Sequence, residues 1–149
     1  MRCVVQRVAS SSVTSEGVLA GQIGPGLMVL IDVSVDDTEA DVKYMAEKIP
    51  NLRIFDDENG VMNRSVLDAG GSILAVSQFT LYGDTRGGRR PSYFRAAKPD
   101  LADRLYEQLV SCWRAKGIHV ETGVFRTEMQ VTLVNDGPVT ILLDSEKTI

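Results

Sequence analysis

Histidine and cysteine are scarce in this sequence, which has one histidine and two cysteines among 149 residues. The single histidine, His119, cannot build a His-rich metal site, and Cys3 and Cys112 lack the CxxC spacing of zinc and redox sites. Buried thiols are the simpler interpretation of both cysteines. A Ser-His-Asp triad would also need His119, yet no serine or carboxylate is placed beside it by spacing. We therefore expect no metal and no catalytic triad.

Long apolar runs are missing as well. No run approaches the ~18 residues of a membrane-spanning helix, and segment 1–7 becomes charged again too soon for a signal-peptide core. The GxSxG, Walker and GxGxxG motifs are absent, which disfavours nucleotide-driven chemistry. We expect a cytoplasmic protein that has no membrane partner and no cofactor.

The composition is that of a folded globular protein. Hydrophobic residues make up 44% of the chain and charged residues 24%, far from the regime of disorder. A chain of this length removes roughly two-thirds of its unfolded surface from water on folding. We expect one domain that spans residues 1–149.

Positive charge is concentrated in one segment, although the net charge is −4. Segment 84–98 carries +4, so the rest of the chain carries −8. Its basic residues are Arg86, Arg89, Arg90, Arg95 and Lys98. Glycines and aromatics alternate with these side chains, a pattern typical of phosphate or nucleic-acid contact, while a merely solvated loop is the alternative.

Hydrophobic periodicity predicts strands at both ends of the chain and two helices between them. One helix follows the capping residues 36–38 and stops at Pro50, and the other runs from Pro99 to Gly117 with a leucine stripe. The predicted strands lie near residues 4–8, 27–31, 51–55, 73–76, 118–125, 129–134 and 139–143. The pattern indicates an α+β fold: a mostly antiparallel, barrel-like sheet with two covering helices.

Two polar segments are not explained by folding alone. Ser77–Thr80 follows an apolar strand, so its polar side chains and backbone N–H groups could meet a ligand at a rigid strand end. The alternative is an ordinary half-exposed strand with Phe79 buried. Segment 135–140, Asn-Asp-Gly-Pro-Val-Thr, separates two predicted strands with a Gly-Pro bond where a hairpin would use Asn-Gly or Asp-Gly.

These segments and their spacing resemble the D-aminoacyl-tRNA deacylases. The resemblance runs from Met1–Val8 through Asn51–Phe55 to Ser77–Leu81, Gly88–Ser92 and Asn135–Thr140. It implies hydrolysis of the ester of D-aminoacyl-tRNA, and of glycyl-tRNA, as chiral proofreading by a homodimer whose active site lies at the interface. Gly137-Pro138 is expected to be cis, to enter the partner's pocket and to reject L-amino acids.

The resemblance also implies roles for single residues. Thr80 orients water or substrate more plausibly than it acts as a nucleophile, because no base is available to activate it. The implied catalytic residues are Ser77, Gln78, Phe79 and Thr80; the supporting residues are Arg7, Asn135, Thr140 and Met129; the tRNA-binding residues are Arg86, Arg89 and Arg90.

One position departs from the family pattern. Arg126 follows Phe125 where the family has a small residue, which affects the fit of the terminal adenosine. Two other functions remain open: a noncatalytic RNA-binding dimer, and a structural dimer without a ligand. A hydrolysis assay separates the enzyme from both, because only the enzyme releases free amino acid.

Overall fold

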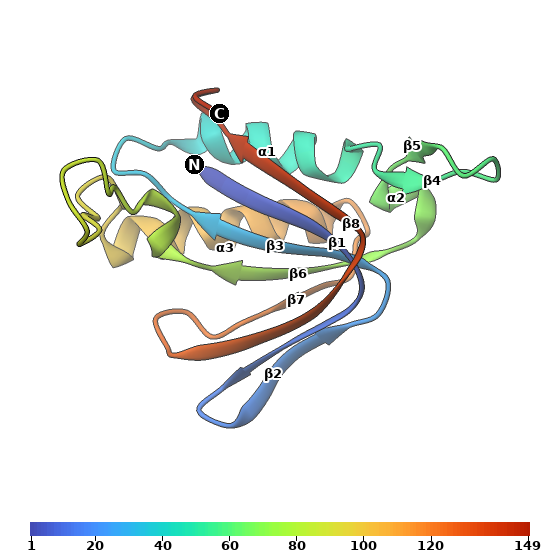
Figure 1. Ribbon diagram of the computed structural model, residues 1–149, viewed down its shortest axis with the longest axis horizontal. Helices are drawn as coiled ribbons and strands as arrows, with labels where there is room; N and C mark the ends of the chain where they lie inside the picture. The colour runs from blue at the N-terminus through green and yellow to red at the C-terminus, as the bar shows by residue number, and fades with distance from the viewer.

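The computed structural model describes residues 1–149 and confirms an α+β fold built on one nearly closed mixed sheet (Figure 1). The strands are β1 (Arg2–Ser15), β2 (Val18–Ile23), β3 (Gly26–Asp32), β4 (Phe55–Asp56), β5 (Met62–Arg64), β6 (Ser72–Ser77), β7 (Val120–Thr122) and β8 (Met129–Asp144). The helices are α1 (Glu39–Asn51), α2 (Val66–Ala69), the 3-10 turn η1 (Phe79–Tyr82) and α3 (Pro99–Ala115). No helix is long and apolar enough to cross a membrane.

Strand β1 organises the sheet because three strands pair with it. β8 pairs antiparallel along nearly all of β1, while β3 pairs with Arg2–Val8 and β2 with Ser11–Ser15, also antiparallel. β6 then adds to β3 and β7 adds to β6, both in parallel. The sheet is therefore mixed, and its antiparallel half carries the two chain ends.

Both faces of β3 and β6 are buried, which explains their continuous apolar sequences. On one face, Leu27, Val29, Ile73 and Ala75 pack in the large core beneath α1 and α3. On the other face, Met28 and its neighbours pack in a smaller core inside the curl of the sheet. Figure 1 shows the two long helices beside one part of the sheet and the β2 hairpin extending away from them.

The two predicted long helices form as their sequence signals indicate. Thr38 caps α1 in a capping box with Asp41, and the helix ends one residue beyond Pro50. In α3, Leu105, Leu109 and Trp113 are fully buried, which confirms that the apolar stripe belongs to the core.

Three details of local structure differ from what the sequence suggested. Residues 129–134 and 139–143 belong to one strand, β8 (Met129–Asp144), but the pairing of β8 with β1 is interrupted between them: Asn135 lies opposite Val8 and Thr140 opposite Gln6, so residues 136–139 have no partner in β1. The alternative of a half-exposed strand at 77–80 with Phe79 buried does not hold, because η1 begins at Phe79 and this side chain is exposed. Residues 51–54 are not a strand, because α1 continues to Asn51 and β4 starts at Phe55.

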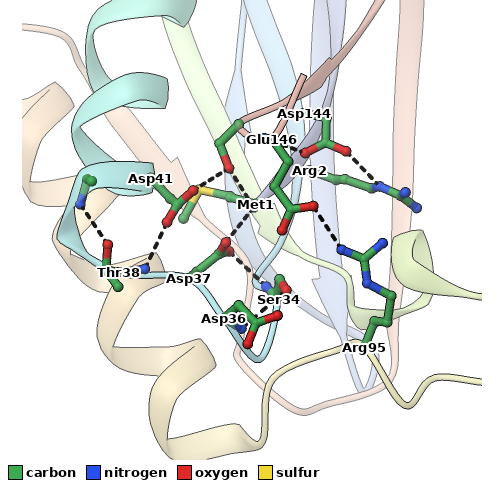
Figure 2. A network of polar contacts seen from close by, with 12 residues as sticks. Met1, Arg2, Ser34, Asp36, Asp37, Thr38, Asp41, Arg95, Asp144 and Glu146 are labelled. Atoms are coloured by element: carbon green, nitrogen blue, oxygen red, sulfur yellow. Dashed lines mark hydrogen bonds and ion pairs between the residues drawn. The ribbon is translucent and has the colours of Figure 1, made fainter. Parts of the chain in front are cut away.

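The chain ends are joined by a buried polar network, drawn in Figure 2. The Met1 α-ammonium group lies 2.7 Å from the Asp37 carboxylate and donates to the Ser145 hydroxyl at 2.8 Å. The other Asp37 oxygen accepts from the Ser34 N–H at 2.8 Å. These contacts hold the start of β1, the end of β8 and the loop after β3 together.

Candidate functional site

A cavity of about 730 Å³ opens where β6 ends and η1 begins. Ser77, Gln78, Phe79 and Thr80 all line it, so the four residues predicted as catalytic come together. The opposite walls come from Tyr93 and residues 96–99, from Ala102 of α3 and from residues 125–129 and 131. Met129, predicted as a supporting residue, lies in this wall.

The turn η1 gives the cavity a set of backbone donors. The Gln78 N–H donates to the Ile31 carbonyl oxygen at 2.8 Å, and the chain then leaves the sheet into a 3-10 turn. The first N–H groups of a helical turn have no partner within it. The Phe79 and Thr80 N–H groups occupy this position, where they can face a developing oxyanion.

Side-chain contacts fix the roles that Gln78 and Thr80 can play. The Gln78 Nε2 donates to the Thr80 Oγ1 at 2.9 Å, so the hydroxyl oxygen is held by a donor and not by a base. Activation of a hydroxyl nucleophile requires an adjacent base. The geometry therefore favours an orienting Thr80.

Aromatic side chains form the rim of the cavity. Phe79 is 59% exposed, contrary to the buried position it would have in an ordinary strand. It makes an edge-on contact with Tyr93, with ring centroids 5.2 Å apart. Exposed rings of this kind offer a surface on which a nucleobase can stack.

Arg126 also lines the cavity, from a tight turn between β7 and β8. Its φ is +63°, in the left-handed region that favours glycine. The Thr127 hydroxyl, which donates to the Val124 carbonyl oxygen at 2.9 Å and contacts the Ser15 hydroxyl at 2.7 Å, fixes this turn.

Asp32, which the sequence analysis missed, lines the same cavity from the end of β3. Its carboxylate is buried and accepts from the Tyr82 N–H at 2.9 Å. Burial raises its pKa to about 7, because the loss of solvation outweighs the bonds from backbone N–H groups. The sequence did contain a sign of this residue's position, because Asp32 directly follows the apolar run 27–31 and so lies at the end of a buried strand.

The segment around Gly137 and Pro138 forms a second cluster that does not line this cavity. The Gly137–Pro138 peptide bond is cis, and both residues are exposed. Arg7 Nε donates to the Asp136 carbonyl oxygen at 3.1 Å, and its Nη1 donates to the Ile54 carbonyl oxygen at 2.8 Å.

Asn135 and Thr140 close the base of this loop. The Asn135 Nδ2 donates to the Thr140 Oγ1 at 3.1 Å, and its Oδ1 accepts from the Val139 N–H at 3.3 Å. Three of the four residues predicted as supporting, Arg7, Asn135 and Thr140, therefore contact the loop that carries the Gly-Pro element, whereas Met129 lies in the cavity wall.

The basic segment is less uniformly charged than its sequence suggests. Arg86 makes a close ion pair with Asp84 at 2.7 Å, which holds the pKa of that carboxyl well below its usual range, and Arg95 pairs with Glu146 at 3.0 Å. Arg89 and Arg90 are exposed and appear in no ion pair of this structure.

No group of three or more His, Cys, Asp or Glu side chains that could hold a metal ion is found.

Comparisons with known proteins identify a family and agree with the fold. The family model described as D-Tyr-tRNA(Tyr) deacylase matches residues 4–144. The "D-aminoacyl-tRNA deacylase" of Symbiobacterium thermophilum is 61% identical over 148 residues, 99% of this chain and 98% of the relative. The protein of the same name from Bacillus velezensis is 57% identical and covers 99% of this chain and 100% of its own.

Solved structures share the same fold. The protein named c-Myc DNA Unwinding Element Binding Protein superposes with a TM-score of 0.91 at 40% identity, over 97% of this chain and 98% of its own. A probable eukaryotic D-amino acid tRNA deacylase gives a TM-score of 0.82 at 18% identity, over 95% and 97% of the two chains, and shows the fold alone. On the family model and the full-length relatives together, this chain belongs to the D-Tyr-tRNA(Tyr) deacylase family.

Proposed function

We propose that this chain hydrolyses the ester bond between a D-amino acid and the 3′-terminal ribose of tRNA. Membership of the family makes it a D-aminoacyl-tRNA deacylase, a hydrolase. The observation that carries the proposal for this chain's own residues is the cavity at the end of β6, where Gln78, Thr80 and the free end of η1 meet.

The reaction does not require a side chain that acts as a general base, because the ester has a neighbouring ribose hydroxyl that can assist proton transfer to the leaving oxygen. The protein must position the ester and a water molecule, an effect that reaches roughly 7–11 kcal/mol in favourable cases. The Phe79 and Thr80 N–H groups are the donors for the tetrahedral oxyanion.

Chiral selection is proposed to come from a second subunit. Gly137 and Pro138 are exposed, and Arg7 holds the residue before them, Asp136, yet they lie outside the cavity of their own chain. The same strand carries exposed apolar side chains, Val134 and Leu142. A homodimer that buries this strand would let one subunit's Gly-Pro element form a wall of its partner's cavity.

The wall explains selectivity by exclusion. The side chain of a bound D-amino acid would point away from the carbonyl groups of Gly137 and Pro138, whereas the side chain of an L-amino acid would collide with them. Glycine has no side chain to exclude, so glycyl-tRNA should be cleaved. Arg89 and Arg90, which have no carboxylate partner, are proposed to contact tRNA phosphates.

The central experiment compares tRNAs carrying D-tyrosine, L-tyrosine and glycine, and measures free amino acid against time. Release from the D-aminoacyl and glycyl substrates with negligible release from the L-aminoacyl one is expected. Tight tRNA binding without release from any substrate would instead establish the noncatalytic RNA-binding dimer.

Subunit mixing tests the cross-subunit site. Gln78→Ala damages the cavity and Gly137→Ala damages the proposed wall, so each homodimer should be impaired. If the wall belongs to the partner, random mixing restores one intact site in half of the dimers, about a quarter of wild-type activity. Activity that stays at the level of the separate variants would place both elements in one subunit's site.

A further inference from the structure

A buried carboxylate at the edge of the cavity has no role in the reaction described above. Asp32 ends the apolar strand β3, and the residue is only 3% exposed. Burying a charge is costly unless it is paired or hydrogen-bonded, so its position needs a compensating function.

The contacts of Asp32 lead to the catalytic turn. Its carboxylate accepts the Tyr82 N–H at 2.9 Å, at the last residue of η1. The preceding residue, Ile31, accepts the Gln78 N–H at 2.8 Å, just before η1 begins. Two consecutive residues of β3 therefore hold the turn at both of its ends.

We propose that Asp32 is a positioning residue for the deacylation: by accepting the Tyr82 N–H, it holds η1 so that the Phe79 and Thr80 N–H groups face the reacting ester. The inference rests on the proposed function of those donors. Asp32 acts through the turn and does not touch the substrate.

The ionised form of the Asp32 carboxylate holds the turn more strongly than the protonated form. A hydrogen bond to a charged acceptor is roughly twice as strong as one between neutral groups, so protonation of Asp32 loosens the turn. Because burial raises its pKa to about 7, this change falls near neutral pH.

The charged and titratable groups around Asp32 set where this change occurs. The Met1 α-ammonium group lowers its pKa and the Asp37 carboxylate raises it; Figure 2 shows these two groups in contact with each other. Cys3 faces it from β1 and Tyr82 from η1. Arg2 lies over the Tyr82 ring at 4.6 Å and donates to the Leu81 carbonyl oxygen at 3.2 Å.

The kinetic test compares the wild type, Asp32→Asn and Asp57→Asn from pH 6 to pH 9, with uncatalysed hydrolysis subtracted. Asp57 is the matched control, because its carboxylate also accepts backbone N–H groups, those of Asn59 and Val61, but on an exposed turn outside the cavity. Wild-type and Asp57→Asn kcat should rise as pH passes about 7. Asp32→Asn should lower kcat by roughly tenfold, leave KM within about twofold and flatten the profile, as loss of transition-state positioning requires.

A second measurement holds even if Asp32→Asn fails to fold. In the ¹⁵N-labelled wild type, the Tyr82 amide proton should move to higher field as pH falls through about 7, and the Phe79 and Thr80 amides should shift with it. A Tyr82 resonance that does not titrate, or an Asp32→Asn profile that matches the wild type, overturns the proposal. A wild type that titrates in this way but releases no amino acid refutes the proposed function and with it the role of Asp32 in deacylation, while it shows that the carboxylate still holds the Tyr82 N–H.

Discussion

Thr80 carries a small hydroxyl side chain whose hydrogen bond favours one of its two proposed roles. Its oxygen accepts from the Gln78 amide, so it is held in place by a group that cannot remove its proton. A nucleophilic threonine would need the opposite arrangement. The residue is therefore better suited to orient water or substrate in the cavity.

Thr80→Ala should accordingly reduce kcat only modestly. We expect a loss well below the roughly 10²–10³-fold that removal of an oxyanion donor costs, because the backbone N–H of residue 80 remains. Single-turnover hydrolysis of D-tyrosyl-tRNA measures the loss. An acyl group found on Thr80 by mass spectrometry would instead establish covalent catalysis.

Gly137 is the residue whose substitution tests the geometry of the exposed loop. Its φ is +124°, and a Cβ there would lie 3.0 Å from Arg7 Nη2 and 2.8 Å from Val139 Cγ2. Gly137→Ala should therefore cost about 1–3 kcal/mol in unfolding free energy and displace Arg7.

Urea denaturation measures the cost at Gly137, and D-aminoacyl-tRNA hydrolysis shows whether activity is lost with it. Gly87→Ala is the matched control, because a Cβ at Gly87 meets no atom within 4 Å. Equal stability of the two variants would show that the loop relaxes freely around a side chain.

At the scale of elements, the segment between η1 and α3 combines paired and unpaired arginines. Arg86 is neutralised by Asp84 and Arg95 by Glu146, so much of the formal charge of this segment is already matched. Arg89 and Arg90 remain exposed on a bend of the chain. These two residues should supply the salt-dependent part of tRNA binding.

Replacing Arg89 and Arg90 together with alanine should weaken tRNA binding and flatten its dependence on salt. Each lost phosphate contact to a single strand changes the slope of log K against log salt by about 0.7. Filter binding at several salt concentrations measures this slope. The control, Arg104→Ala, removes an arginine paired with Glu39 on the helical side and should leave the slope unchanged.

The preference for D-amino acids should survive the loss of Arg89 and Arg90, because the proposed chiral wall lies on β8. A slope equal to that of the wild type would show that segment 84–98 is a solvated loop that does not contact tRNA phosphates. A change in the D-over-L ratio would instead show that the segment shapes the cavity itself.

At the scale of the whole molecule, two buried carboxylates near the chain ends make stability depend on pH. Burial raises the pKa of Asp32 to about 7 and raises that of Asp37 as well, although the Met1 α-ammonium group opposes both shifts. A raised folded-state pKa favours the protonated form, so its stabilising contribution is complete at low pH and is lost as pH rises through that value.

The unfolding free energy of the wild type should therefore fall relative to that of Asp32→Asn between about pH 4, the ordinary pKa of an aspartate, and about pH 7, its raised value in the folded protein. We expect a relative change of at least about 1–2 kcal/mol, because a pKa difference of one corresponds to roughly 1.4 kcal/mol. Urea denaturation at several pH values measures the two curves. Parallel curves would show that Asp32 keeps its ordinary pKa in the folded protein.

Much of this protein follows from local sequence. Periodicity placed α1 and α3, because capping residues and a helical apolar stripe act within a few neighbouring residues. The apolar run before Ser77 indicated a buried strand with polar residues at its end, and the structure places these at a cavity. The resemblance of the polar segments identified the family that the comparisons then showed.

Other features were decided only by tertiary contacts. β8 continues on both sides of residues 136–139 because β1 pairs with each part, residues 8–15 with residues 129–135 and residues 2–6 with residues 140–144, which no local propensity reveals. Segment 79–82 forms a turn whose two ends are held by residues almost 50 positions earlier. The Ile31 carbonyl oxygen accepts the Gln78 N–H just before the turn, and the Asp32 carboxylate accepts the Tyr82 N–H at its end. The sequence by itself determined which residues are apolar, capped or unusual, whereas the assembly of distant strands determined which of them meet, because hydrogen bonds and burial depend on neighbours in space.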